Sequence, residues 1–289
     1  MIIESPRGLG TWSVTSYNPT QSGFPAPQRQ YDGDRAVADQ EPNMTSHTPQ
    51  TRSTEQHNSY QRWYYETTDK KTMQPSGMPY VHRQIDRMAD IARLGQAENI
   101  LEVGCGMGRY SLPLLERGYE LTCLDLSPVL LQRLQDAARI QPKHVIACDL
   151  AEVADHTSAR FDRAIGFFTL HHMHDLDLIF QGLAKVLKPG AIVAFCEPVA
   201  YNPLYYVQIA ATPRMTWKGD GGVARMRSGL VLPALQRAGF VDTRSTAFGF
   251  FPPFVTNHPW GAALETLMER VRLFAPLHAF QIFSATFHG

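Results

Sequence analysis

Acidic residues and glycines stand at the ends of short apolar segments, and such positions can bind a small ligand. The first segment is NILEVGCGMGRY, residues 99–110, in which Glu102 precedes glycines at positions 104, 106 and 108. A glycine at every second position lets the backbone adopt positive φ, and the missing Cβ lets a ligand approach bare main chain. The pattern predicts a ligand-binding turn after a buried strand. An ordinary tight turn is the alternative.

Three classes of cofactor site use a glycine turn after a strand, and the neighbouring residues distinguish them. A phosphate-binding P-loop requires Lys and then Ser or Thr after its second glycine, whereas this chain continues with Met107 and then Gly108. A dinucleotide-binding turn requires a small residue where this chain has Arg109, because the helix must pack closely on the strand there. The pattern that remains is acid-x-Gly-x-Gly-x-Gly.

This pattern resembles motif I of the class I S-adenosylmethionine-dependent methyltransferases. The resemblance implies that the cofactor is S-adenosyl-L-methionine. It also implies that the following residues form the cofactor-binding turn: Glu102, Gly104, Cys105, Gly106 and Gly108. The cofactor carries no phosphate, so the turn needs no Lys, and its amino acid head and sulfonium cation suit backbone carbonyls and carboxylates.

Two further acids end predicted strands at positions that agree with this family. Asp125 ends a strand over residues 119–126, about 20 residues beyond the glycine turn, where α/β units place an acid that accepts from ribose hydroxyls. The alternative for Asp125 is a plain residue at a helix start. Asp149 ends a strand over residues 144–150, and by resemblance it accepts from the exocyclic amine of adenine.

By the same resemblance, Leu126 and Leu150 line the adenine base. The next predicted strand, residues 161–170, contains Gly166 and Phe167, and we expect the backbone there to approach the methionine moiety of the cofactor. Tyr64 and Tyr65, on an aromatic-rich helix before the glycine turn, are candidates for contact with the same moiety, because related enzymes fold such a helix over the cofactor. Packing of the helix on the sheet is the alternative.

Histidines follow the strand at 161–170 in the sequence HHMHD. We expect no metal site, because adjacent histidines on a strand-to-helix turn rarely point the same way. His171 or His172 is a candidate general base that faces the methyl acceptor. Glu197, at the tip of the strand over 191–198, and Tyr201 after it are candidates for acceptor contact.

Composition limits the classes of partner. The chain has 289 residues with 27 basic and 27 acidic side chains, and it shows no basic stripe, so we expect no nucleic acid partner. No apolar run approaches the roughly 20 residues of a membrane span. The N-terminus lacks the basic and apolar regions of a signal peptide, so the expected location is cytoplasmic.

Each of the four cysteines falls in or just after a predicted strand, which favours small buried thiols.

The expected fold is α/β, with a doubly wound, mainly parallel seven-stranded sheet and a helical cap. Residues 1–55 are polar and lack apolar periodicity, which predicts a weakly ordered leader, and residues 56–289 form the predicted methyltransferase domain. A cap at about 200–228 is rich in aromatic residues and is expected to contact the acceptor. The predicted helices after the glycine turn span 110–117, 128–140, 177–187, 230–238 and 260–274, and the last two strands span 241–250 and 280–287.

The expected reaction is methyl transfer to a small, partly apolar acceptor at oxygen, nitrogen or carbon. One alternative is a protein of the same fold that binds S-adenosyl-L-methionine but catalyses a non-methylating step such as cyclisation. Another is a non-catalytic binding protein. A homodimer is compatible with the sequence. The fold by itself cannot identify the acceptor.

Overall fold

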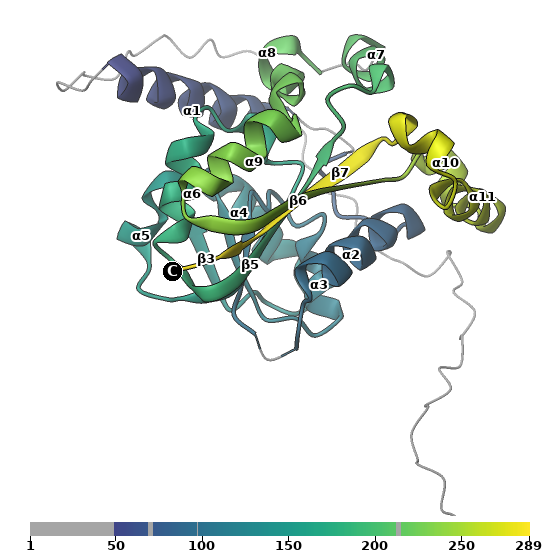
Figure 1. Cartoon of the computed structure of the whole chain (residues 1–289). Helices are drawn as coiled ribbons and strands as arrows, with labels where there is room; N and C mark the ends of the chain where they lie inside the picture. Colours follow the sequence, from purple (N-terminus) through teal and green to yellow (C-terminus); the bar gives the residue numbers. More distant parts are fainter. Residues whose placement is uncertain (1–48, 69–71, 97, 212–214) are drawn as a thin grey trace, which may run out of the picture. The chain divides into compact units, whose positions relative to one another are not determined.

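The strand that precedes the glycine turn is third from one edge of a seven-stranded sheet in the computed structural model (Figure 1). The strands are β1 (Ile100–Val103), β2 (Leu121–Asp125), β3 (His144–Ala147), β4 (Phe161–Phe167), β5 (Leu187–Pro198), β6 (Phe240–Phe248) and β7 (Phe280–Phe287). Their order is β3-β2-β1-β4-β5-β7-β6, with β7 antiparallel to both of its neighbours and the other pairs parallel. The predicted fold class is confirmed.

The structure describes residues 49–68, 72–96, 98–211 and 215–289. The α-helices are α1 (Pro49–Thr67), α2 (Pro79–Ala92), α3 (Ser111–Glu116), α4 (Pro128–Ala137), α5 (Val153–His156), α6 (Leu176–Ala184), α7 (Pro203–Ala211), α8 (Trp217–Asp220), α9 (Ser228–Arg237), α10 (Pro253–Thr256) and α11 (Pro259–Glu269). Short 3-10 turns are η2 (Leu150–Glu152), η3 (Leu170–His172), η4 (Gly221–Arg225) and η5 (Arg272–Leu277). None of the helices described is long and apolar enough to cross a membrane.

Two apolar clusters, one for each face of the sheet, hold these helices in place. The first includes Phe180 of α6 and Leu235 of α9, and the second includes Ile85 of α2 and Leu134 of α4. The side chains in β1 are buried on both faces, as expected for a parallel strand covered by helices. The sequence order of the strands reverses between β1 and β4, and α/β sheets bind ligands at this kind of position.

Local sequence explains where the helices beside the sheet begin. Ser127 caps α4 by accepting the N–H of Leu130, and Pro128 occupies the first helical position, where its missing N–H costs nothing. Asp175 caps α6 by accepting the N–H groups of Asp177 and Leu178. All four cysteines are buried and unpaired.

Helix α6 and turn η2 approach each other closely at Gly182. A Cβ at this position would lie 2.6 Å from Cα of Ala151 and 2.6 Å from the carbonyl oxygen of Leu150. Both residues belong to η2, which follows the end of β3. Only glycine therefore allows this distance between the helix and the turn.

Several predicted boundaries differ from the structure. Helix α1 begins at Pro49, so residues 49–55 of the predicted leader are helical, and its residues 1–48 lie outside the described part of the chain. Helix α6 ends at Ala184, before the predicted 187, because the segment Leu187–Gly190 already belongs to β5. The predicted helix at 260–274 divides into α11 and η5.

Candidate active site

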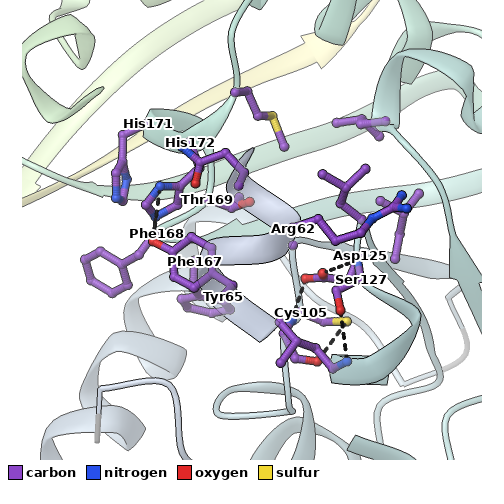
Figure 2. A pocket seen from close by; sticks show the side chains of 18 of the residues that line it. Arg62, Tyr65, Cys105, Asp125, Ser127, Phe167, Phe168, Thr169, His171 and His172 are labelled. Atoms are coloured by element: carbon purple, nitrogen blue, oxygen red, sulfur yellow. Dashed lines mark hydrogen bonds between the residues drawn. The ribbon is translucent and has the colours of Figure 1, made fainter. Parts of the chain in front are cut away.

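A cavity of about 350 Å³ lies at the carboxyl ends of the parallel strands. It is lined by the glycine turn after β1, the ends of β2, β3 and β4, one face of α1, and parts of α7 and α8. Figure 2 shows Tyr65 and His172 toward one end of this cavity and Cys105, Asp125 and Ser127 toward the other. Eleven predicted site residues line it together: Tyr65, Gly104, Cys105, Gly106, Asp125, Leu126, Asp149, Leu150, Phe167, His171 and His172.

The glycine turn exposes main chain to the cavity at one position. Gly104 and Gly106 have φ values of +67° and +55°, a region that residues with a Cβ rarely adopt. A Cβ on Gly106 would meet no atom within 4 Å, whereas a Cβ on Gly104 would lie 1.9 Å from Oγ1 of Thr169. Gly104 is therefore required for packing, and Gly106 leaves space for a ligand.

Asp125 organises this end of the cavity. Its Oδ2 accepts the N–H of Gly106 at 2.8 Å, and its Oδ1 accepts the N–H of Ser127 at 2.9 Å. Burial raises the pKa of the Asp125 carboxyl above its ordinary value, and these two N–H groups oppose that rise. The hydroxyl of Ser127 in turn donates to Oε1 of Glu66 at 2.6 Å, which joins the strand end to α1.

Asp149 occupies a similar position at the end of β3. Its Oδ1 accepts the N–H of Ala151 at 3.0 Å, and its Oδ2 accepts from the side-chain amide of Asn58 on α1. Gln61, one turn further along α1, also lines the cavity, and its buried Oε1 has no hydrogen-bond partner. A buried acceptor left unpaired is destabilising, so a donor on a bound ligand would stabilise this side chain.

His171 and Glu197 form a buried pair at the other end of the cavity. Nδ1 of His171 lies 2.6 Å from Oε2 of Glu197, while Oε1 of Glu197 accepts the N–H groups of Thr169 at 2.9 Å and Leu170 at 2.7 Å. An imidazole whose Nδ1 donates its proton has a basic Nε2. Because His171 lines the cavity, that nitrogen is the atom of the pair that a ligand can use.

Both ring nitrogens of the neighbouring His172 are occupied. Its Nδ1 lies 3.0 Å from the carbonyl oxygen of Gly219, and its Nε2 lies 2.8 Å from the hydroxyl of Tyr65. Tyr65 is also 3.4 Å from Oδ1 of Asp220. Burial and the charge of Asp220 raise the pKa of Tyr65 well above its ordinary range. The two histidines therefore differ, and His171 is better suited to act as a base.

Arg225 of η4 fixes the backbone that carries these histidines. Its guanidinium donates to the carbonyl oxygens of His174 at 2.7 Å, Met173 at 2.6 Å and His171 at 3.3 Å. Burial lowers the pKa of this guanidinium from its ordinary value. The end of the cap is thus bound to the turn after β4.

Three predicted cofactor-binding residues in β1, the glycine turn and β4 lie outside the cavity lining. Glu102 is buried beneath the glycine turn, with the thiol of Cys123 donating to it at 3.9 Å. Gly108 has a φ of +92° and packs against Leu112 and Leu134. We expected a ligand to approach Gly166, but a Cβ there would instead meet the side chains of Phe195 and Thr169 within 3 Å.

The other predicted residues outside the lining are Tyr64, Glu197 and Tyr201. Tyr64 donates to Oδ2 of Asp220 at 2.7 Å and is buried, whereas the next residue, Tyr65, lines the cavity. Glu197 lies behind His171 and cannot contact an acceptor directly. Tyr201 is 71% exposed, with the guanidinium of Arg227 5.4 Å from its ring centre. None of these three side chains lines the cavity.

Most of the cavity wall formed by α1 was not predicted from the sequence. The residues of α1 at the cavity are Thr54, Asn58, Gln61, Arg62 and Tyr65, of which only Tyr65 was predicted. Their spacing places them on one face of a helix, and a polar and aromatic stripe at this spacing is a signal that could have been recognised. Within the described residues, no group of three or more His, Cys, Asp or Glu side chains is arranged to hold a metal ion.

Known proteins resemble the central part of the chain. Residues 101–195 match the family model described as a methyltransferase domain. A malonyl-[acyl-carrier protein] O-methyltransferase of Pseudescherichia vulneris is 35% identical over 119 residues, which are 39% of this chain and 46% of that protein. A tRNA 5-carboxymethoxyuridine methyltransferase of Escherichia coli is 26% identical over 133 residues, 44% of this chain and 50% of that protein. The chain thus spans about half the length of these relatives.

A solved structure shows the same fold over a larger part of the chain. The crystal structure of a SAM dependent methyltransferase from Archaeoglobus fulgidus superposes with a TM-score of 0.52 and covers 72% of this chain and 93% of that one. The two sequences are 14% identical, so this likeness concerns the fold alone.

Proposed function

We propose that this chain, a member of the class I S-adenosylmethionine-dependent methyltransferases, methylates a small, partly apolar acceptor whose reacting atom carries a proton at neutral pH. The observation that supports this proposal is the position of the His171–Glu197 pair, which lies in the wall of the cavity that Gly106, Asp125 and Asp149 also line. A base at this position is useful only if the acceptor must lose a proton.

The residues of the cavity fit the cofactor of this family. Gly106 leaves its main chain open, and the buried Oε1 of Gln61 lacks a donor. Asp125 and Asp149 offer carboxylates from neighbouring strand ends. When bound, S-adenosyl-L-methionine supplies an electrophilic methyl group on a sulfonium cation. The main chain around Gly106 and the Asp125 carboxylate would hold its amino acid and ribose parts.

Asp149 and two leucines form the part of the site that suits the adenine ring. Leu126 and Leu150 line the cavity, as Asp149 does, and supply apolar surface for a flat base. Asn58 from α1 holds one oxygen of Asp149, and the N–H of Ala151 holds the other. These contacts orient the carboxylate before any ligand arrives.

His171 would accept the proton of the methyl acceptor at Nε2. Glu197 holds the proton on Nδ1, keeps the ring in one orientation and stabilises the imidazolium that forms. Glu197 is therefore a positioning residue, and His171 is the proposed catalytic base.

Much of the cavity wall is apolar and aromatic, and the ring centre of Tyr205 lies 6.4 Å from that of His171. The lining also includes Tyr80, Phe168, Met215 and Phe280. A hydroxyl or amine on an apolar or aromatic frame would match both these walls and the base. A carboxylate acceptor is already ionised at neutral pH and would not need His171.

Two measurements test this proposal. Titration calorimetry with S-adenosyl-L-homocysteine is expected to show binding, and Asp125→Ala should weaken it by about 1–3 kcal/mol, because Gly106 and Ser127 lose their acceptor. Turnover is then measured with S-adenosyl-L-methionine and a panel of phenols, aliphatic alcohols, amines and carboxylates, with malonyl-acyl carrier protein and tRNA included. We expect methylated product from a phenol, alcohol or amine.

The variant His171→Asn separates binding from catalysis. It should bind S-adenosyl-L-homocysteine as the unaltered chain does but lose turnover. Product formed only from carboxylates, from the carrier protein or from tRNA would contradict the proposed acceptor class. Absence of cofactor binding would contradict the proposed reaction as a whole.

A further inference from the structure

Phe168, directly after β4, has a backbone conformation that a bulky side chain rarely adopts. Its φ is +54°, which lies in the left-handed region. Among the non-glycine residues that the structure describes, Arg93 and Asp242 also have positive φ, but Arg93 ends helix α2 and Asp242 interrupts the pairing of β6 with β7. Strain of this kind persists only where the surroundings fix it, and it is concentrated at ligand sites.

Hydrogen bonds to β5 hold Phe168 in this conformation. Its N–H donates to the carbonyl oxygen of Cys196 at 2.7 Å. The next two N–H groups, those of Thr169 and Leu170, donate to Oε1 of Glu197 at 2.9 Å and 2.7 Å. Three consecutive N–H groups after β4 are therefore bound to the end of one neighbouring strand, so the fold imposes the conformation of this turn.

The positive φ places the ring of Phe168 in the cavity wall. Consecutive side chains of an extended strand point to opposite faces, yet Phe167 and Phe168 both lie against Tyr110, with ring centroids 4.1 Å and 6.1 Å from it. In contrast to the buried Phe167, Phe168 is partly exposed, and it lines the cavity. Figure 2 shows Phe168 at the same end of the cavity as His171 and His172.

Other aromatic rings line the cavity around Phe168. Phe280 stands edge-on to Phe168, with centroids 5.5 Å apart and an angle of 79° between the ring planes, and Tyr80 stands edge-on to Phe280 at 6.0 Å and 69°. Tyr205 stands edge-on to the imidazole of His171 at 6.4 Å and 79°. Edge-to-face contacts stabilise rings beyond the effect of the area they bury. A flat ring bound in this cavity can make such contacts, and a saturated ring cannot.

We propose that Phe168 selects a methyl acceptor that carries a flat aromatic ring beside its reacting hydroxyl or amine group. This inference rests on the proposed function and narrows it from a partly apolar acceptor to an aromatic one. Stability of the turn by itself does not explain a phenylalanine here, because glycine would adopt the same φ without strain. Phe168 is thus a specificity-determining residue.

Binding of two alcohols to the full chain loaded with S-adenosyl-L-homocysteine tests the inference without turnover. The probes are benzyl alcohol and cyclohexylmethanol, which carry the same CH₂OH group and differ in the ring. Nuclear magnetic resonance titration should show that benzyl alcohol binds more tightly by about two- to ten-fold, the range for a favourable pair of aromatic rings. Because the saturated ring is the more hydrophobic of the two, this preference reports contacts between rings.

Two leucine variants identify the ring that causes the preference. Phe168→Leu keeps an apolar side chain at the cavity and should remove the preference for benzyl alcohol. The matched control is Phe248→Leu. Phe248 also packs on Phe280, with centroids 5.7 Å apart, but it lies outside the cavity lining, so this variant should keep the preference. Circular dichroism must show that both variants fold.

Thermal melting of Phe168→Gly and Phe168→Ala tests the backbone conformation. Glycine adopts positive φ freely, so Phe168→Gly should melt at a higher temperature than Phe168→Ala, although it removes more of the side chain. A lower melting temperature for the glycine variant would show that residue 168 is not strained, and the inference would lose its first observation.

The outcomes separate this inference from the proposed function. If the loaded chain binds both alcohols equally or neither of them, or if Phe168→Leu keeps the preference, the inference is overturned while methyl transfer can still be observed with other acceptors. Equal loss of the preference in Phe168→Leu and Phe248→Leu would assign Phe168 to packing. Absence of S-adenosyl-L-homocysteine binding would overturn the proposed function, and this inference with it.

Discussion

Nδ1 of His171 lies 2.6 Å from Oε2 of Glu197, and the other oxygen of the same carboxylate accepts two backbone N–H groups from the turn after β4. The same buried side chain thus fixes the turn and the histidine ring. The arrangement favours the tautomer with the proton on Nδ1, since a carboxylate can only accept. Catalysis should depend on residue 197 although it does not line the cavity.

Glu197→Gln tests this dependence. The amide oxygen can still accept from Thr169 and Leu170, but the amide nitrogen then faces Nδ1 of His171, and two donors cannot pair. The imidazole should therefore move its proton to Nε2 and lose its basic atom. We expect kcat to fall by about 10²–10⁴-fold, the usual contribution of a general base, with little change in KM for the cofactor.

Thermal melting and the KM for the cofactor provide the control for Glu197→Gln, because both should stay close to those of the unaltered enzyme. A loss confined to KM, or a fall in activity that only follows a lower melting temperature, would mean that Glu197 serves folding alone.

Two glycines of one turn should respond differently to alanine. Gly104→Ala must displace Thr169, because its Cβ would lie 1.9 Å from Oγ1, and we expect a large loss of unfolding free energy. The Cβ of Gly106→Ala would enter open space, so this variant should lose only about 1–2 kcal/mol of unfolding free energy, because of the positive φ. It should nevertheless weaken cofactor binding. Denaturant unfolding and calorimetry separate the two effects. Equal unfolding free energies of the two variants would contradict the assignment of Gly104 to packing and of Gly106 to ligand binding.

Glu102 should make the stability of the ligand-free protein depend on pH. Burial raises the pKa of Glu102 to about 7 from an ordinary 4.5. The folded state thus favours the protonated acid, and its stabilising contribution is complete below pH 4.5 and is lost as pH rises through about 7. The difference amounts to about 3 kcal/mol, since one pKa unit corresponds to about 1.4 kcal/mol.

Unfolding free energies of the unaltered chain and of Glu102→Gln, measured between pH 4.5 and 8, test this dependence. The variant cannot ionise, so its stability should fall less over that interval. Parallel curves for the two proteins would show that Glu102 ionises normally in the folded state.

Arg225→Ala should destabilise the turn that carries the histidines. Three backbone carbonyl oxygens lose their donor, and we expect a loss of about 1–3 kcal/mol of unfolding free energy together with lower kcat. The matched control is Arg237→Ala, which removes an exposed ion pair with Asp177 at 2.8 Å and should cost at most about 1 kcal/mol. If both variants lose the same unfolding free energy, the contacts of Arg225 with the carbonyl oxygens contribute no more than an exposed ion pair does.

The strand-end positions were predictable because one geometric rule governs them. Parallel strands end at a common edge, so Gly106, Asp125 and Asp149, each just after or at the end of a strand, had to approach one another. No detailed side-chain geometry was needed for that inference. The family resemblance added the expected ligand, and the comparisons support the family independently.

Residues beyond the strands were harder to predict, because on a helix a shift of one position rotates a side chain by about 100° around the axis. Tyr64 and Tyr65 are neighbours in sequence, yet only Tyr65 reaches the cavity, and the sequence does not fix the rotation of α1. Glu197 and Gly166 show a second difficulty, since a polar residue or a glycine near a site can serve the packing behind the wall instead of the wall itself.

The contact between Gly182 and η2 has a consequence for protein engineering. Gly182 is no part of the cavity lining, but the two residues it touches, Leu150 and Ala151, are. A methyl group introduced at position 182 has to push that turn inward or force α6 outward. Substitutions at this remote position would therefore narrow or widen the part of the pocket that is proposed to hold adenine, and they offer a route to enzymes that discriminate between natural and enlarged cofactor analogues.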